Sequence, residues 1–105
     1  MVDRKIEELV RQFRQRMETM LGGSLEVILY GSYARGQASE DSDIDLLVIL
    51  PYRNSQVENL LDEAAWEIGF QAGKVLSVIP VGKDELPLLQ ASPFFQNVQR
   101  EGILI

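Results

Sequence analysis

Hydrophobic side chains recur every three or four positions in two stretches of the chain, residues 3–21 and residues 54–73. This spacing places the apolar positions on one face of a helix, so both stretches predict amphipathic helices. Asp3 is expected to cap the start of the first helix, and Gly22 to end it in the left-handed conformation. Gly73 provides the same stop signal for the second helix.

Runs rich in Val, Ile and Leu predict β-strands at residues 24–30, 44–50 and 74–81. A polar, turn-rich loop over residues 36–42 joins the first two strands. Residues 83–90 predict a short helix interrupted by Pro87, and Ser92-Pro93 predicts the start of a last helix that runs to Arg100. The strands are almost continuously apolar, so we expect a small α/β (α+β) domain with a sheet covered by helices on at least one face.

Composition narrows the class of protein. The chain has 105 residues, 46% of them hydrophobic and 25% charged, which predicts a single domain over residues 1–105. Its net charge of −6 would repel nucleic-acid phosphates, so we expect no direct contact with nucleic acid. The apolar runs are far shorter than the roughly twenty residues of a membrane-spanning helix. We therefore expect a cytoplasmic protein without a membrane anchor.

Cysteine and histidine are both absent from the sequence. Their absence removes disulfides, thiol nucleophiles, imidazole bases and the usual zinc ligands. Any bound metal ion must then be held by oxygen atoms, which favours Mg²⁺ or Mn²⁺.

Asp43 and Asp45 stand two positions apart where the second strand begins. Their side chains should therefore point to the same side of the sheet, with Cβ atoms about 6.5 Å apart. Two carboxylates at that distance repel each other by about 2–3 kcal/mol at an effective dielectric near 20, and a divalent cation turns this repulsion into attraction. We interpret the pair as metal ligands, with ordinary turn carboxylates as the simpler alternative.

Gly31 and Ser32 form a turn ten residues ahead of the acid pair. Glycine lets the backbone approach a phosphate closely, and the serine offers a hydroxyl and an N–H to phosphate oxygens. A turn and two carboxylates together would hold a Mg²⁺–nucleoside triphosphate. Transfer reactions of such a substrate need mainly positioning and charge neutralisation, which a site without His or Cys can supply.

Two further residues are candidates for the nucleotide site. Arg35 could steady a triphosphate, or it could form an ion pair with Glu40, Asp41 or Asp45, and the sequence leaves both interpretations open. Ser42 precedes the acid pair directly, and a turn cap is the simpler role for it.

The motif of Gly31-Ser32, ten residues and Asp43-x-Asp45 resembles the signature of the polymerase-β-like nucleotidyltransferases. The hexapeptide Gly-Ser-Tyr-Ala-Arg-Gly and the closing run from Pro93 to Gly102 are similar to minimal nucleotidyltransferase (MNT) domain proteins. This resemblance implies a mixed sheet flanked by helices, two Mg²⁺ ions on the strand carboxylates, and transfer of AMP from ATP to an acceptor. Many such proteins are antitoxins that silence a HEPN-domain ribonuclease toxin by adding AMP to a tyrosine.

The third strand departs from the family pattern. The superfamily places a third carboxylate there as general base and shared ligand, but the nearest position here is Ser77, and no Asp or Glu occurs between Glu67 and Asp84. Serine is a poor proton acceptor near neutral pH. Three outcomes stay open: Asp84 or Glu85 swings into the site, the acceptor partner contributes a group, or catalysis is weak.

Two functions therefore compete. The first is an adenylyltransferase antitoxin that modifies a HEPN-type toxin protein, and the second is a weak or inactive nucleotidyltransferase fold that neutralises its partner by contact. Transfer to a small molecule such as an aminoglycoside is less favoured, because 105 residues leave little chain for an acceptor pocket. The sequence leaves a homo-oligomer open.

The remaining apolar residues are interpreted mostly as structural. We expect the core to contain Trp66, Ile68, Phe70, Phe94 and Phe95. Tyr33 and Tyr52 are expected to pack or to face a partner in preference to stacking on a base. The apolar end, residues 103–105, either docks on the sheet or core or contacts a toxin or a second copy.

Overall fold

The protein contains a four-stranded sheet with helices on both faces. The computed structural model describes residues 2–105. Its elements are, in chain order, α1 (Arg4–Leu21), β1 (Glu26–Tyr30), α2 (Ser32–Arg35), β2 (Ile44–Leu50), α3 (Ser55–Ala72), β3 (Leu76–Gly82), the 3₁₀ turn η1 (Lys83–Glu85), α4 (Leu86–Leu89), α5 (Pro93–Glu101) and β4 (Ile103–Leu104).

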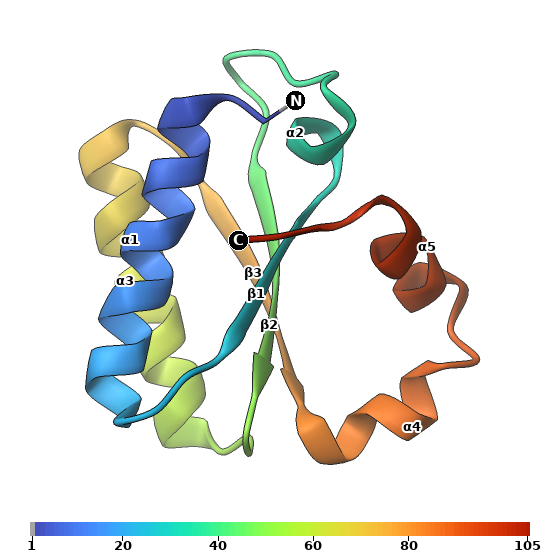
Figure 1. Ribbon diagram of the computed structural model, residues 1–105. Helices are drawn as coiled ribbons and strands as arrows, with labels where there is room; N and C mark the ends of the chain where they lie inside the picture. Colours follow the sequence, from blue (N-terminus) through green and yellow to red (C-terminus); the bar gives the residue numbers. More distant parts are fainter. Residues whose placement is uncertain (1) are drawn as a thin grey trace.

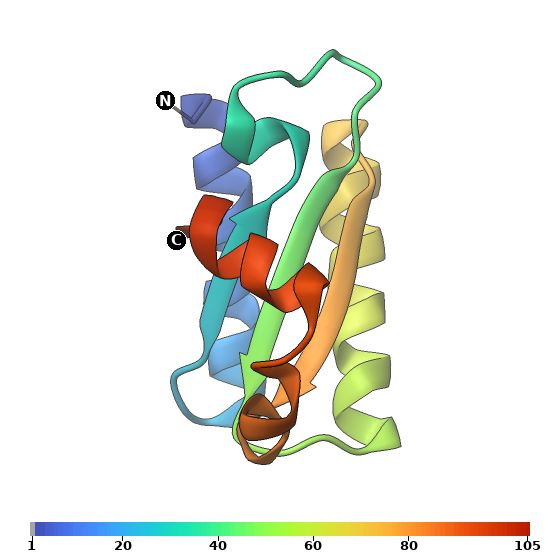
Figure 2. The same ribbon diagram turned by 90° about the vertical axis from the view of Figure 1, so that its right-hand side faces the viewer.

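The sheet is mixed, with strand order β3-β2-β1-β4. Strand β1 runs antiparallel to both β2 and β4, whereas β2 and β3 are parallel. Helices α1 and α3 lie together against one face, and α4 and α5 lie on the other (Figures 1 and 2). The predicted fold class, a small mixed sheet flanked by helices, is confirmed.

Helix boundaries follow from local capping groups. The Asp3 carboxylate accepts a hydrogen bond from the backbone N–H of Lys5 at 2.8 Å. Gly22 and Gly73 end α1 and α3 with φ of 72° and 68°. Ser92 caps α5 by accepting from the N–H of Phe95 at 3.4 Å. These predicted caps are confirmed, and each satisfies backbone groups that a helix end leaves without partners.

Strand β2 is buried on both faces, which explains its continuous apolar sequence. Ile44, Leu46, Val48 and Leu50 belong to the larger core beneath α1 and α3. Leu47 and Ile49 belong to the smaller core with Val81, Phe95 and Val98. Each fully buried leucine-sized side chain contributes about 1.5–3 kcal/mol. Burial on both sides therefore holds the start of β2 in one position.

Three of the five residues expected in the core lie on the surface. Trp66, Phe70 and Phe94 are 66%, 71% and 45% exposed, so that prediction is wrong for them, whereas Ile68 and Phe95 are buried as expected. The cause is the position of residues 66 and 70 on α3. The helix buries the stripe that contains Val57, Leu61, Ala64, Ala65 and Ile68, and the two aromatics lie outside it.

The C-terminal residues dock on the sheet. Strand β4 pairs with Ile28 and Leu29 of β1, and the N–H of Ile105 donates to the carbonyl of Val27 at 3.0 Å. The guanidinium of Arg14 also donates to the carbonyl of Ile105. The sheet-docking interpretation of residues 103–105 is confirmed. Over residues 2–105, the structure has no helix of the length and apolarity that a bilayer crossing demands.

Candidate active site

The acid pair lies where β2 begins. Asp45 is the second residue of β2, and its register partners are Tyr30 on β1 and Ser77 on β3. Side chains alternate along a strand, so Asp45 points to the same face as Leu47, which is the α5 face. Asp43 is exposed and Asp45 is half-buried. The start of β2 is therefore the open end of a face that is otherwise covered.

Gly31 lies directly against Asp45. It follows β1 with φ 76° and ψ −154°, a conformation that essentially only glycine adopts. A Cβ at this position would collide with the Asp45 carboxylate, because the carboxylate carbon would be 3.2 Å away and one oxygen much closer. The turn and the acid pair, which are separated in the sequence, thus form one site.

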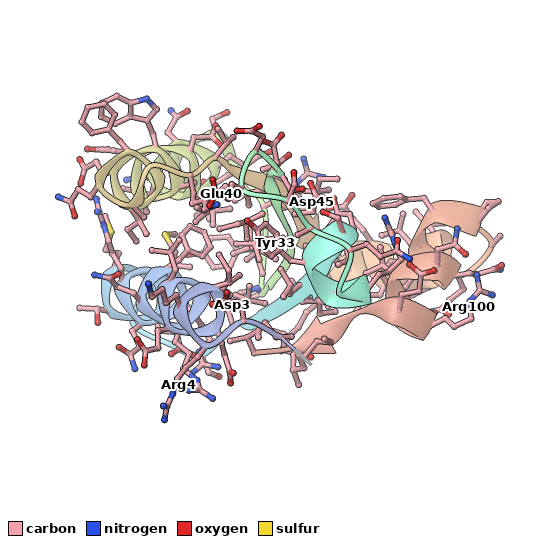
Figure 3. The ribbon with its side chains drawn as sticks, turned by 90° about the horizontal axis from the view of Figure 1, so that it is seen from above. Asp3, Arg4, Tyr33, Glu40, Asp45 and Arg100 are labelled. Atoms are coloured by element: carbon pink, nitrogen blue, oxygen red, sulfur yellow. The ribbon has the colours of Figure 1, made fainter. Side chains whose placement is uncertain are left out.

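Helix α2 is a single turn between two glycines with positive φ. The N–H of Arg35 donates to the carbonyl of Gly31 at 3.1 Å, and the N–H of Gln37 donates to the carbonyl of Ser32 at 2.9 Å. Gly36 closes the turn with φ 70°. Seen from above, α2 lies beside Asp45 (Figure 3). This arrangement holds Ser32, which follows Gly31, at the edge of the acid pair.

Electrostatics at the site favour a cation. Burial raises the pKa of Asp45 above its ordinary value, the negative charge of Asp43 raises it further, and the Arg35 guanidinium opposes both effects. Burial also raises the pKa of Tyr30, and so does the charge of Asp45. Burial is the larger cause of both shifts, and the mutual repulsion of the negative charges adds to it, which a bound cation would relieve.

The donor set fits a hard metal ion. Two carboxylates and the hydroxyls of Ser32 and Ser77 are the oxygen ligands that Mg²⁺ and Mn²⁺ prefer. Within residues 2–105, however, no group of three or more acidic side chains gathers to complete such a site. The chain therefore supplies two carboxylates, and the other ligands of an ion would have to come from a nucleotide, water or a partner.

The idea that Asp84 or Glu85 swings into the site is wrong. Ser77 stands beside Asp45 at the start of β3, and these acids follow its far end, about 17 Å away along the strand. Glu85 is also held there, because it accepts from the N–H of Gly82 at 2.9 Å and from Arg53 at 3.1 Å. The other two explanations of the missing carboxylate stay open.

Arg35 forms an ion pair with Glu101 at 3.4 Å. The alternative that Arg35 pairs with Glu40, Asp41 or Asp45 is wrong within residues 2–105, because Arg35 ends α2 and extends towards the end of α5. The hydroxyl of Ser42 accepts from the N–H of Ser39 at 2.9 Å, so it caps the turn. The roles of Arg35 and Ser42 in nucleotide binding stay predictions.

One connection was missed in the sequence. The ammonium of Lys74 donates to the hydroxyl of Tyr33 at 3.0 Å and to the carbonyl of Glu40 at 2.8 Å. It also lies 5.7 Å from the centre of the Tyr33 ring. Tyr33 points away from Asp45, towards the space between α1 and α3 (Figure 3). Lys74 thus holds the loop between the Gly-Ser turn and the acid pair in place. No local sequence pattern indicates such a long-range contact.

Comparison with known protein families identifies the class of this protein as the nucleotidyltransferases. The chain belongs to the family described as "Nucleotidyltransferase domain", whose model matches residues 10–97. The predicted membership in this class is confirmed.

Among curated relatives, a protein of Methanocaldococcus jannaschii that carries the name of a protein adenylyltransferase is 35% identical over 102 residues. The match covers 93% of this chain and 69% of that protein. A second protein of the same organism and the same kind of name is 43% identical over 47 residues, which cover 44% of this chain and 48% of that protein.

Solved structures share the fold. A Sulfolobus solfataricus crystal structure described as a nucleotidyltransferase has a TM-score of 0.59 and 16% identity, over 95% of this chain and 78% of that chain. A toxin-antitoxin crystal structure with AMP-PNP has a TM-score of 0.57 and 22% identity, over 95% of this chain and 68% of that chain.

Proposed function

We propose that the protein transfers AMP from ATP to a hydroxyl group of a protein acceptor, and that the acceptor is a HEPN-type toxin which this modification silences. The close approach of Gly31 to Asp45 is the observation that carries the proposal, because it brings the Gly-Ser turn, the candidate phosphate site, against the acid pair, the candidate metal ligands. The name of the 35% identical relative supports protein adenylylation, and the description of the toxin-antitoxin structure supports an antitoxin role. A reaction that consumes ATP fits the expected cytoplasmic location.

Each residue has a defined task in this reaction. Gly31 and Ser32 would bind the phosphates of ATP, and Asp43 and Asp45 would hold Mg²⁺ or Mn²⁺. When bound, the ion neutralises phosphate charge. The acceptor oxygen bonds to the α-phosphorus, the bond from that phosphorus to the bridging oxygen breaks, and pyrophosphate leaves. Ser77 is too weak a base to take the hydroxyl proton, so the proton passes to a group of the acceptor or to solvent.

The experiment combines the protein, Mg²⁺ and the product of the neighbouring gene with ATP labelled at the α-phosphate. The wild type should label the acceptor, and γ-labelled ATP should not. Asp43→Asn/Asp45→Asn should lower the rate by about 100-fold or more, since charge stabilisation worth several kcal/mol is lost.

A matched control is Glu40→Gln/Asp41→Asn, which changes the charge equally at two exposed loop residues and should leave the rate close to that of the wild type. If the wild type binds the acceptor and transfers no label, the catalytic proposal is wrong.

A second candidate is a binding module that neutralises its toxin without chemistry. Ser77, which stands beside Asp45 where the family pattern has a carboxylate, is the observation that favours it. Under this hypothesis the Asp43→Asn/Asp45→Asn variant still protects cells that produce the toxin. Under the first hypothesis that protection is lost, so a growth assay distinguishes the two.

A further inference from the structure

An exposed apolar patch lies on the α3 side of the molecule. Trp66, Phe70 and Val75 are 66%, 71% and 60% exposed, and we call these residues the aromatic patch. The two rings are stacked, with centres 5.1 Å apart and planes 13° from parallel. Exposed clusters of this kind mark interaction surfaces, and tryptophan is among the residues that contribute most to binding.

The patch borders a groove beside β3. The groove is lined by the aromatic patch together with Asp62, Ala65, Lys74, Leu76 and Val78. Strand β3 is an edge of the sheet and, among residues 2–105, has no strand on its outer side (Figure 2). Pro80 in this strand lacks an N–H and weakens any added strand pairing. A partner would therefore bind mainly through side chains that enter the groove.

The groove lies near the same end of the sheet as the candidate active site, but on the opposite face. The carbonyl of Val75 accepts from the N–H of Ile44 at 2.8 Å, and Ile44 is the residue between Asp43 and Asp45. Two residues further along, Ser77 stands beside Asp45. That step is about 7 Å by the rise of a strand. Ser77 and Asp45 point to the α5 face, so a protein seated on the aromatic patch reaches the acid pair only by also covering the outer edge of β3.

The charged residues near the aromatic patch indicate what kind of partner can bind there. Asp62, Trp66 and Phe70 follow each other at four-residue steps, so one stripe of α3 carries them. Asp62 and Glu63 are exposed, and neither forms an ion pair with any residue from 2 to 105. A second copy would bring its own Asp62 and Glu63 and a net charge of −6 to this surface, which disfavours self-association. A partner whose binding surface has basic residues around an apolar centre would complement this surface.

We propose that the aromatic patch is the docking surface for the protein acceptor, which places an apolar side chain in the groove and Lys or Arg residues beside Asp62 and Glu63. The proposal rests on the proposed function and adds to it where the acceptor binds. An acceptor that docks on the patch and extends around the β3 edge would bring its hydroxyl to the open end of β2.

The test compares Trp66→Ala/Phe70→Ala with Tyr52→Ala/Leu88→Ala, a control that truncates two other exposed residues, 57% and 82% exposed. Affinity for the product of the neighbouring gene is measured by calorimetry, and AMP transfer is measured over a range of acceptor concentrations. The patch variant should bind about 10-fold more weakly or worse. Its transfer should need correspondingly more acceptor, whereas the KM for ATP should stay unchanged. The control should behave like the wild type.

A charge variant tests the second half of the proposal. Asp62→Lys/Glu63→Lys should weaken binding and reduce its dependence on salt. Equal acceptor affinity of the patch variant and the wild type overturns the proposal. Self-association of the wild type that the patch variant abolishes overturns it in favour of a second copy. If the wild type neither binds nor labels the acceptor, the proposed function fails, whereas equal labelling by wild type and patch variant refutes the docking proposal alone.

Discussion

At the scale of single residues, Gly31 connects backbone conformation to chemistry. Its positive φ ends β1 with a sharp turn, and its missing side chain leaves room for the Asp45 carboxylate. Gly36 shares the positive φ, with 70°, but a Cβ there would meet no atom within 4 Å. A comparison of alanine substitutions at the two glycines therefore separates the effect of backbone strain from the effect of contact with the acid pair.

Gly31→Ala is expected to impair the site much more than Gly36→Ala. Both variants carry a backbone strain of about 1–3 kcal/mol, but only Gly31→Ala also displaces Asp45. AMP transfer by Gly31→Ala should fall by about 100-fold, since small errors in position are costly in catalysis. Gly36→Ala should lose stability and retain most of its activity. Thermal unfolding and transfer rates check this, and equal activity of the two folded variants would contradict it.

At the scale of elements, the site is formed by a loop and two strands. Other contacts must hold these three segments in place relative to one another. The loop between α2 and β2 carries the connection from the Gly-Ser turn to the acid pair. Lys74, which follows α3, holds this loop through Tyr33 and the carbonyl of Glu40. Tyr33 also donates to the carbonyl of Ser39 at 3.4 Å. Lys74 is thus a positioning residue that acts through the loop.

Lys74→Met should loosen residues 36–42 without unfolding the domain. We expect faster amide hydrogen exchange in this loop and a KM for ATP that rises several-fold, because the turn no longer holds one position opposite Asp45. Lys74→Arg retains a cation and hydrogen-bond donors and should restore part of the affinity. Unchanged exchange in the loop of Lys74→Met would show that these contacts do not order it.

At the scale of the whole molecule, the two faces of the sheet are covered to different extents. Helices α1 and α3 cover one face along its length, whereas α4 and α5 leave the start of β2 open (Figure 1). At the opposite end of the sheet, Arg53 forms ion pairs with Glu58 at 2.9 Å and with Glu85 at 3.1 Å. These pairs join the start of α3 to the segment after β3.

The ion pair between Arg53 and Glu85 predicts that the stability of the fold depends on pH. The N–H of Gly82 and the Arg53 guanidinium hold the pKa of Glu85 below its ordinary value near 4.5. A carboxylate with a lowered pKa in the folded state stabilises the fold above its ordinary pKa, and this stabilisation disappears as the pH falls through the folded-state value. Glu85→Gln should therefore be less stable than the wild type above pH 4.5 and converge with it in stronger acid.

Denaturant unfolding at a series of pH values measures this difference. The matched control is Glu63→Gln, which removes one exposed carboxylate from α3 and should leave the pH profile unchanged. A constant gap between Glu85→Gln and the wild type down to the strongest acid would contradict the assigned ion pair.

The sequence by itself determined the longer helices and strands and the acid pair at the centre of the site, whereas α2 and β4 were seen only in the structure. Helices and strands follow from local periodicity, and their ends follow from caps such as Asp3, Gly22 and Gly73. Asp43 and Asp45 share a face because strand geometry has a period of two. These properties depend on neighbours in the chain, so they can be read without the fold.

Only the tertiary structure decided which surfaces the elements cover. Periodicity assigns residues to one face of a helix, but it does not give the width of the face that neighbouring elements cover. Trp66 and Phe70 are exposed because they lie outside the covered width of α3. The partner of Arg35, the tie formed by Lys74 and the distance from Glu85 to Asp45 depend on segments far apart in the chain. Such contacts are set by how α3, β3 and α5 pack together, and no local pattern records them.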